Sequence, residues 1–364
     1  MQPHLAKAFP YPAGRPIEEV EREFGLTNVI KLASNENPLG PSPKALKAMR
    51  QCARKMHLYP DGDCYYLRQA LATKHNVTPE QIIVGGGSDD LNTFIMTSYL
   101  GPGRTLVASL GSFIRYEQAA IVSGGEVLNV PFKNWRHDID ALLAAVGPAT
   151  GALCVANPEN PVGCMITKAE TDRLVNETPE RVFLLLDHAY YEFCQHEPDY
   201  PDAVAYVRDR PNVMVTRTFS KAYGLAGLRV GYGISSPRII ETLHRTRPPF
   251  NVTRMGQEAA LAALEDVEHV QRVREVNREG MAYYEAQFAQ MELEFIKSYA
   301  NFITVNVRRD ASTVFQAMLR KGVILRPLGG YRMPTWMRIS IGLMRENRRC
   351  VRELKAVLRA IPEA

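Results

Sequence analysis

The sequence predicts an α/β fold: a large domain with a mostly parallel mixed sheet between helices, followed by a smaller α+β C-terminal domain. From residue 43 to about residue 250, nearly continuous Val, Leu and Ile runs alternate with amphipathic runs, which is typical of a parallel sheet buried on both faces. After Pro248 and Pro249 the apolar residues take helical spacing, and only two further strand-like runs follow. A chain of 364 residues is long enough for two domains.

The expected elements follow in chain order. Residues 1–40, rich in Pro, Asn and Gly, are expected to form an N-terminal arm with a short helix at 17–24, packing on the C-terminal domain. Residues 41–250 form the expected large domain, with strands at 82–84, 105–109, 126–130, 152–156, 182–186, 213–216 and 230–234, and helices at 43–54, 66–75, 89–100, 116–122, 139–146, 168–177 and 203–209. Residues 251–364 form the expected small domain, with a long helix over 267–291, strands near 302–307 and 338–341, and a terminal helix from residue 346.

The composition excludes several classes of function. Hydrophobic residues at 46% and charged residues at 23% are ordinary globular values. The net charge of +5 comes from scattered Lys and Arg, so we expect no nucleic-acid partner. The six cysteines show no CxxC pair and no metal-ligand spacing, which favours a reducing, cytoplasmic compartment and no bound metal. There is no signal-peptide core and no apolar run long enough to span a membrane, so we expect no membrane association.

Segment 217–232 carries the strongest functional signal. Lys221 follows an apolar run at 213–215 and stands among small and hydroxylated residues. A lysine on a turn after a buried strand can be desolvated, and its pKa then falls toward the range in which the free amine is a nucleophile. Thr218 and Ser220, together with Arg229, can hold a phosphate group beside that amine. The segment therefore indicates a site for pyridoxal phosphate, whose aldehyde needs an amine and whose phosphate needs an anchor.

Two other strand ends fit the same cofactor. Gly87, Ser88 and Asp89 stand at a glycine run that opens a helix, where backbone N–H groups can bind an anion. The GxGxxG fingerprint of dinucleotide-binding folds is absent from this turn. Asp187 follows the apolar run 183–186, so its carboxylate emerges at the C-terminal end of a buried strand, where ligands bind in open α/β sheets. A protonated pyridine nitrogen would give this carboxylate the partner that a buried charge needs.

Together these segments resemble the fold-type I pyridoxal-phosphate aminotransferases, most closely the histidinol-phosphate aminotransferase family, from about Tyr11 to the C-terminus. The resemblance implies that Lys221 forms a Schiff base with the cofactor aldehyde and then serves as general base and acid, and that Asp187 holds the protonated pyridine nitrogen. It also implies that Tyr190 and Asn160 bind the phenolic oxygen of the cofactor. The residues expected at the cofactor phosphate are Gly87, Ser88, Asp89, Thr218, Ser220 and Arg229.

The resemblance extends to the remaining parts of an active site. Phe113 falls where the family stacks a ring on the pyridine. Tyr59 resembles a tyrosine that reaches the cofactor phosphate of the partner subunit, which implies a homodimer with shared active sites. Four residues are expected to bind the substrate: Tyr11 and Asn35 as parts of a wall, and Arg326 and Arg338 at its anionic end.

The reaction implied is the transfer of an amino group from histidinol phosphate to 2-oxoglutarate, by a ping-pong mechanism, in histidine biosynthesis. An aromatic amino-acid aminotransferase and a phosphothreonine-type decarboxylase are alternatives on the same scaffold. A regulatory module would need an appended DNA-binding domain, for which 364 residues leave no room, and the intact set of cofactor residues disfavours an inactive scaffold. His188, Val162 and Gly111 depart from the family pattern and leave the exact amino donor open.

Overall fold

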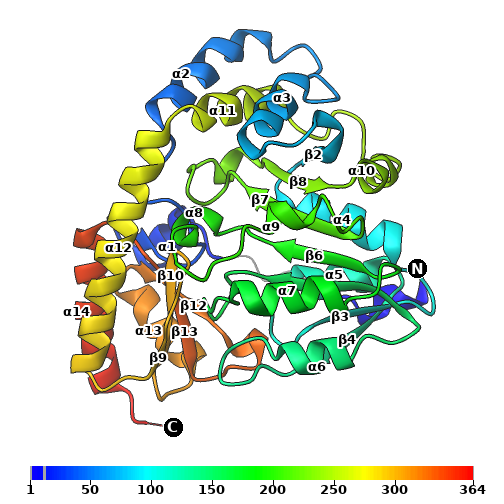
Figure 1. Ribbon diagram of the computed structural model, residues 1–364. Helices are drawn as coiled ribbons and strands as arrows, with labels where there is room; N and C mark the ends of the chain where they lie inside the picture. The colour runs from blue at the N-terminus through cyan, green and yellow to red at the C-terminus, as the bar shows by residue number, and fades with distance from the viewer. Residues whose placement is uncertain (1, 11–13, 364) are drawn as a thin grey trace.

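The computed structural model describes residues 2–10 and 14–363 (Figure 1). Within them, the larger sheet has seven strands in the order β2-β8-β7-β6-β5-β3-β4. The strands are β2 (Ile82–Gly85), β3 (Thr105–Ser109), β4 (Glu126–Val130), β5 (Thr150–Ala156), β6 (Phe183–Asp187), β7 (Val213–Thr218) and β8 (Gly231–Ser235). The neighbours from β7 to β4 are parallel, whereas β8 is antiparallel to both β7 and β2. The sheet is therefore mixed and mostly parallel, and this prediction from the sequence is confirmed.

Both faces of this sheet are buried. Along β6, Leu184 and Leu186 belong to one hydrophobic cluster, while Phe183 and Leu185 belong to another, because successive side chains of a strand point to opposite faces. The first face is covered by α2 (Pro43–Cys52), α3 (Tyr65–His75), α6 (Ile139–Ala144), α7 (Lys168–Glu177), α9 (Ala203–Tyr206) and α11 (Arg254–Leu264). The second face is covered by α4 (Ser88–Tyr99), α5 (Arg115–Val122) and α10 (Pro237–His244). Burial on both faces explains the continuous apolar runs in the sequence.

A second sheet lies lower in Figure 1, with strands in the order β12-β13-β10-β9, all antiparallel. Its strands are β9 (Phe295–Ile296), β10 (Phe302–Asn306), β12 (Arg326–Pro327) and β13 (Trp336–Ser340). Three helices share its hydrophobic core: α12 (Val267–Gln290), α13 (Ala311–Arg320) and α14 (Met344–Ala360). None of the helices in the described part of the chain combines the length and apolar character needed to cross a membrane.

The N-terminal segment packs on this second sheet region. Strand β1 (Ile30–Lys31) pairs in parallel with β11 (Val323–Ile324), and Val20 of α1 (Ile17–Phe24) shares a small core with Leu319. Helix α11 packs into the core of the larger sheet, and α12 then runs from there to the second sheet (Figure 1). The division into 1–40, 41–250 and 251–364 stays a prediction.

Candidate active site

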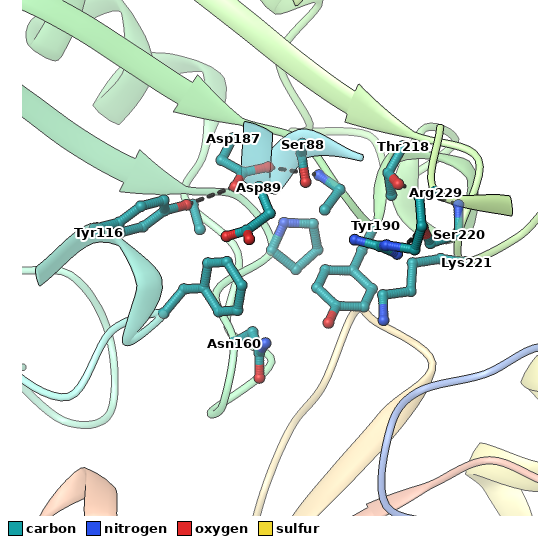
Figure 2. Close-up of a pocket in the computed structure, with 14 residues that line it drawn as sticks. Ser88, Asp89, Tyr116, Asn160, Asp187, Tyr190, Thr218, Ser220, Lys221 and Arg229 are labelled. Carbon is teal, nitrogen blue, oxygen red and sulfur yellow. Dashed lines mark hydrogen bonds between the residues drawn. The ribbon is translucent and has the colours of Figure 1, made fainter. Parts of the chain in front are cut away.

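A pocket opens where β5, β6 and β7 end, beside the first turn of α4 (Figure 2). Because parallel strands end at the same edge of a sheet, the side chains that follow them converge there. The pocket encloses about 610 Å³ of empty space, counting the part open to solvent. Its lining residues are Ser88, Asp89, Phe113, Tyr116, Ala156, Pro158, Asn160, Asp187, Ala189, Tyr190, Thr218, Ser220, Lys221 and Arg229.

Lys221 follows β7 and extends its amine into this pocket (Figure 2). The Nζ atom donates a hydrogen bond to the backbone oxygen of Ser34 at 3.1 Å. Burial, and then the positive charge of Arg338, lower the pKa of the Lys221 amine to about 7. A large fraction of the amine is therefore uncharged near neutral pH, which is the form that attacks a carbonyl group.

Asp187 is the last residue of β6 and its carboxylate is buried. It accepts hydrogen bonds from the Tyr116 hydroxyl at 2.7 Å and from the backbone N–H of Ala189 at 3.1 Å. Burial raises the pKa of Asp187 to about 6, although the hydrogen bond from Tyr116 acts in the opposite direction. Since both donors are neutral, the carboxylate is suited to a ligand that brings a positive charge into the pocket.

Ser88, Thr218, Ser220 and Arg229 line the pocket with donor groups that could hold an anion, and they are called the anion cradle below. Ser88 is the first residue of the twelve-residue helix α4, whose unpaired N–H groups favour an anion. The Arg229 Nη1 atom lies 3.4 Å from the Ser220 hydroxyl. A Cβ atom at Gly87, where φ is +87°, would come within 2.7 Å of Arg229 Nη2. The glycine thus leaves room for the guanidinium next to the helix N-terminus.

Asp89 also lines the pocket, but its carboxylate accepts a hydrogen bond from Arg115 Nε at 2.6 Å. The ion pair with Arg115 offsets the negative charge of Asp89 near the anion cradle. The next residue, Asp90, accepts from the backbone N–H of Gly86 at 2.7 Å and from Asn251 Nδ2 at 3.1 Å. Asp90 therefore holds the glycine turn in place.

Phe113, Asn160 and Tyr190 also line the pocket, and Tyr190 lies beside Lys221 (Figure 2). The Asn160 side-chain oxygen accepts a hydrogen bond from Arg338 Nη1 at 2.5 Å, which leaves its amide N–H groups as donors. The Tyr190 hydroxyl accepts from Asn35 Nδ2 at 2.9 Å and keeps its own proton available. Phe113 makes an edge-to-face contact with Tyr116.

The other residues expected in the site lie at different distances from this pocket. Asn35 and Arg338 do not line the pocket but donate hydrogen bonds to residues that do: Asn35 to Tyr190, and Arg338 to Asn160. Arg326 lies opposite Arg338 in the register of β12 and β13, and both side chains are largely buried. Tyr59 is 78% exposed and stacks on Phe250, with 4.7 Å between the ring centroids, so it does not line the pocket of its own chain. Tyr11 lies outside the described residues.

Sequence reasoning missed Tyr116, which donates a hydrogen bond to Asp187 from the first turn of α5. Its position, three residues after Phe113, places it at the start of a predicted helix, but only the packing of α5 against the sheet brings its hydroxyl to Asp187. In the described part of the chain, no group of three or more His, Cys, Asp or Glu side chains is arranged to hold a metal ion.

The lining fits the cofactor that the sequence predicts. Pyridoxal phosphate has an aldehyde, a pyridine nitrogen and a phosphate group, and the pocket has a matching group for each. Lys221 provides an amine of lowered pKa, Asp187 provides a buried carboxylate with neutral partners, and the anion cradle lies around Arg229.

Comparisons with known proteins agree with this geometry. The model of the family "Aminotransferase class I and II" matches residues 27–354. Histidinol-phosphate aminotransferase from Moorella thermoacetica is 47% identical over 96% of this chain and 90% of its own length. The protein of the same name from Akkermansia muciniphila is 47% identical over 98% of both chains.

A solved structure is similar over the whole fold. The crystal structure of histidinol-phosphate aminotransferase from Sinorhizobium meliloti, in complex with pyridoxal-5'-phosphate, superposes with a TM-score of 0.92. It is 31% identical in sequence and the match covers 100% of this chain and 98% of that one. From the family model and these relatives, this chain belongs to the aminotransferase class I and II family.

Proposed function

We propose that this chain is a pyridoxal-phosphate-dependent aminotransferase that moves the amino group of histidinol phosphate to 2-oxoglutarate. The observation that carries the proposal is the convergence of Lys221, Asp187 and Arg229 in one pocket. The names of the relatives described above, which are similar over nearly the full length, support histidinol phosphate as the donor.

When bound, pyridoxal phosphate draws electrons away from the substrate carbon that loses its proton. The Lys221 Nζ atom is the base that we propose for this proton and the acid that returns it, since a pKa of about 7 makes both forms accessible. The Asp187 carboxylate would keep the ring nitrogen protonated, which strengthens the withdrawal of electrons. Tyr190 and Asn160, each with a free donor, would orient the ring through its oxygen.

The substrate end of the site is proposed to contain Arg326 and Arg338. A phosphate dianion requires more positive charge than a carboxylate, and two guanidinium groups can meet it with charge-assisted hydrogen bonds. Asn35, which is hydrogen-bonded to both Tyr190 and Ser340, would hold the segment that lines the substrate beside these arginines in place.

We also propose a homodimer with shared active sites. Several large apolar or aromatic side chains around the connection between α2 and α3 are exposed: Met56, Leu58, Tyr59, Tyr65, Tyr66 and Phe250. An exposed group of this kind is typical of a protein–protein interface. A second copy of the chain covering it would allow Tyr59 to reach the anion cradle of its partner.

A half-reaction screen tests the proposed function. The purified protein loaded with pyridoxal phosphate is mixed with one amino donor at a time, and the loss of cofactor absorbance is followed. We expect histidinol phosphate to act faster than phenylalanine, tyrosine or aspartate, and 2-oxoglutarate to restore the absorbance. Release of carbon dioxide from a phosphothreonine-type substrate, without formation of a 2-oxo acid, would contradict an aminotransferase.

A further inference from the structure

Glu159 is a buried carboxylate next to the pocket residue Asn160. Its side chain has no exposed surface, and a carboxylate in such a place is costly unless it is paired. The Glu159 Oε2 atom accepts a hydrogen bond from the Ser112 hydroxyl at 2.8 Å and lies 3.0 Å from His137 Nε2. The other ring nitrogen of His137 lies 2.7 Å from the Ser109 hydroxyl.

These groups come from three loops that the sheet brings together. Ser109 ends β3 and Ser112 follows it, His137 lies between β4 and α6, and Glu159 follows β5. Ser112 directly precedes Phe113, and Glu159 directly precedes Asn160. A single carboxylate oxygen therefore connects the two loops that supply Phe113 and Asn160 to the pocket.

The proton on His137 follows from its neighbours. The Nε2 atom lies 3.0 Å from both the Glu159 carboxyl group and the backbone oxygen of Ala156, and a backbone oxygen can only accept. Nε2 must therefore carry a hydrogen. The Ser109 hydroxyl can either donate or accept, so the hydrogen bond at Nδ1 is compatible with a neutral or a charged ring.

The loop after Glu159 is held firmly by its other contacts. The backbone N–H of Gly163 donates to the backbone oxygen of Glu159 at 2.7 Å, and the backbone N–H of Glu159 donates to the backbone oxygen of Cys164 at 2.9 Å. A displacement of Glu159 would therefore move the loop as a unit, including Asn160. The loop with Phe113 has its own backbone hydrogen bond, from Ser112 to Ser109 at 3.1 Å, but Ser112 contacts the Asn160 loop through Glu159.

We propose that Glu159, held by His137 and Ser112, is a positioning residue that fixes the Phe113 loop to the Asn160 loop and so shapes the cofactor pocket. Glu159 is not among the residues that line the pocket, so its effect passes through its neighbours. The proposal rests on the proposed function, because it concerns the fit of pyridoxal phosphate between these loops.

The test measures binding of pyridoxine 5'-phosphate, which lacks the aldehyde and cannot bond to Lys221. Calorimetric titration of the cofactor-free full chain gives its dissociation constant. We expect Glu159→Ala to weaken binding at least about tenfold, since it removes the carboxylate that accepts from Ser112 and lies beside His137. Glu159→Gln should restore most of the affinity, because one amide oxygen can accept from both Ser112 and His137. Ser112→Ala is a milder change that should weaken binding in the same direction, and its effect should not add to that of Glu159→Ala.

A matched control separates positioning from a general loss of stability. Asn347 is also fully buried and makes two side-chain hydrogen bonds, to Gly342, but it does not line the pocket. Asn347→Ala should lower the melting temperature and leave the affinity for pyridoxine 5'-phosphate unchanged. Wild-type affinity in both Glu159→Ala and Ser112→Ala, or an equal loss in Asn347→Ala, would overturn the proposal while the proposed function stands. Failure of the wild-type chain to bind either pyridoxine 5'-phosphate or pyridoxal phosphate would refute the proposed function, and the positioning role with it.

Discussion

Arg326 of β12 and Arg338 of β13 stand directly opposite each other across two antiparallel strands, and both are largely buried. Residues in such a pair point to the same face of the sheet with their Cβ atoms about 4.5–5.5 Å apart, where like charges repel. Arg338 donates hydrogen bonds to the side-chain oxygen of Asn160 and to the backbone oxygen of Ala33, both of which are neutral. Arg338 therefore brings a buried guanidinium group with neutral partners next to Asn160, which lines the pocket.

The first prediction concerns the substrate. Arg326→Ala should lower kcat/KM for histidinol phosphate at least about tenfold, because the loss of one charge-assisted hydrogen bond weakens transition-state binding by about that factor. The same change should lower kcat/KM for phenylalanine much less, because the phenylalanine carboxylate would depend on Arg338 alone. Arg332→Ala is the control, since it removes an exposed arginine from the neighbouring segment. Equal losses for both donors, or a wild-type preference for phenylalanine, would favour an aromatic amino-acid aminotransferase.

The second prediction concerns the amine that bonds to the cofactor. Lys221→Ala should still bind pyridoxal phosphate through the anion cradle but lose turnover by about 10²–10⁴-fold or more, because one amine serves as anchor and proton carrier. Reduction of the wild-type protein with borohydride, followed by peptide mapping, should place the cofactor on the peptide that contains Lys221. A label on another lysine would contradict the assignment.

The third prediction concerns pH. Below about pH 7 the Lys221 amine of the cofactor-free chain is protonated and cannot attack an aldehyde, and above it the amine is neutral. The rate of combination with pyridoxal phosphate should therefore rise about tenfold between pH 6 and pH 8 and then level off. A lysine amide in the same buffers is the control for titration of the aldehyde itself. A rate that continues to rise up to pH 10 would show that the pKa of Lys221 is not lowered.

The positions of the strands could be predicted because burial on both faces leaves continuous apolar runs, as at Val213–Thr218 and Phe183–Asp187. The relative directions of the strands could not be predicted from the sequence. Strand β8 is antiparallel to β7, and no local pattern at Gly231–Ser235 differs from that of a parallel strand. Helix α10 was not predicted, although Pro237 at its first turn and the buried Ile239, Ile240 and Leu243 are a usable signal.

In the candidate site, too, only the features that follow from the order of elements along the chain could be predicted. Lys221 and Asp187 follow strand ends, so their meeting at one edge of the sheet could be predicted from order along the chain. The contacts of Glu159 could not be predicted, because its partners Ser112 and His137 come from separate loops with no shared sequence pattern. Strand β12, which contains Arg326, has only two residues and includes a proline, so it is too short for an alternating pattern.

The fourth prediction concerns Asp187. Asp187→Asn should keep the fold, since the amide oxygen can accept from the backbone N–H of Ala189 and the amide N–H can donate to the Tyr116 hydroxyl oxygen. It should slow loss of the substrate proton by about tenfold to a hundredfold, because an amide does not stabilise a protonated ring nitrogen. Tyr116→Phe leaves the carboxylate in place and should cause a smaller loss. Single-turnover rates with one amino donor measure both variants, and a wild-type rate in Asp187→Asn would make Asp187 a purely structural residue.

The last prediction concerns the shared active site. Tyr59 is 78% exposed and lies outside the pocket of its own chain, so a role at the cofactor phosphate requires a second subunit. Tyr59→Ala should therefore lower activity, whereas Tyr66→Ala, which removes a similarly exposed tyrosine nearby, should not lower it to the same extent. Mixing inactive Lys221→Ala subunits with impaired Tyr59→Ala subunits should restore activity, because one of the two sites in a hybrid dimer then contains both residues. Hybrids whose formation is verified by mass spectrometry and which stay inactive would place Tyr59 outside the partner's site.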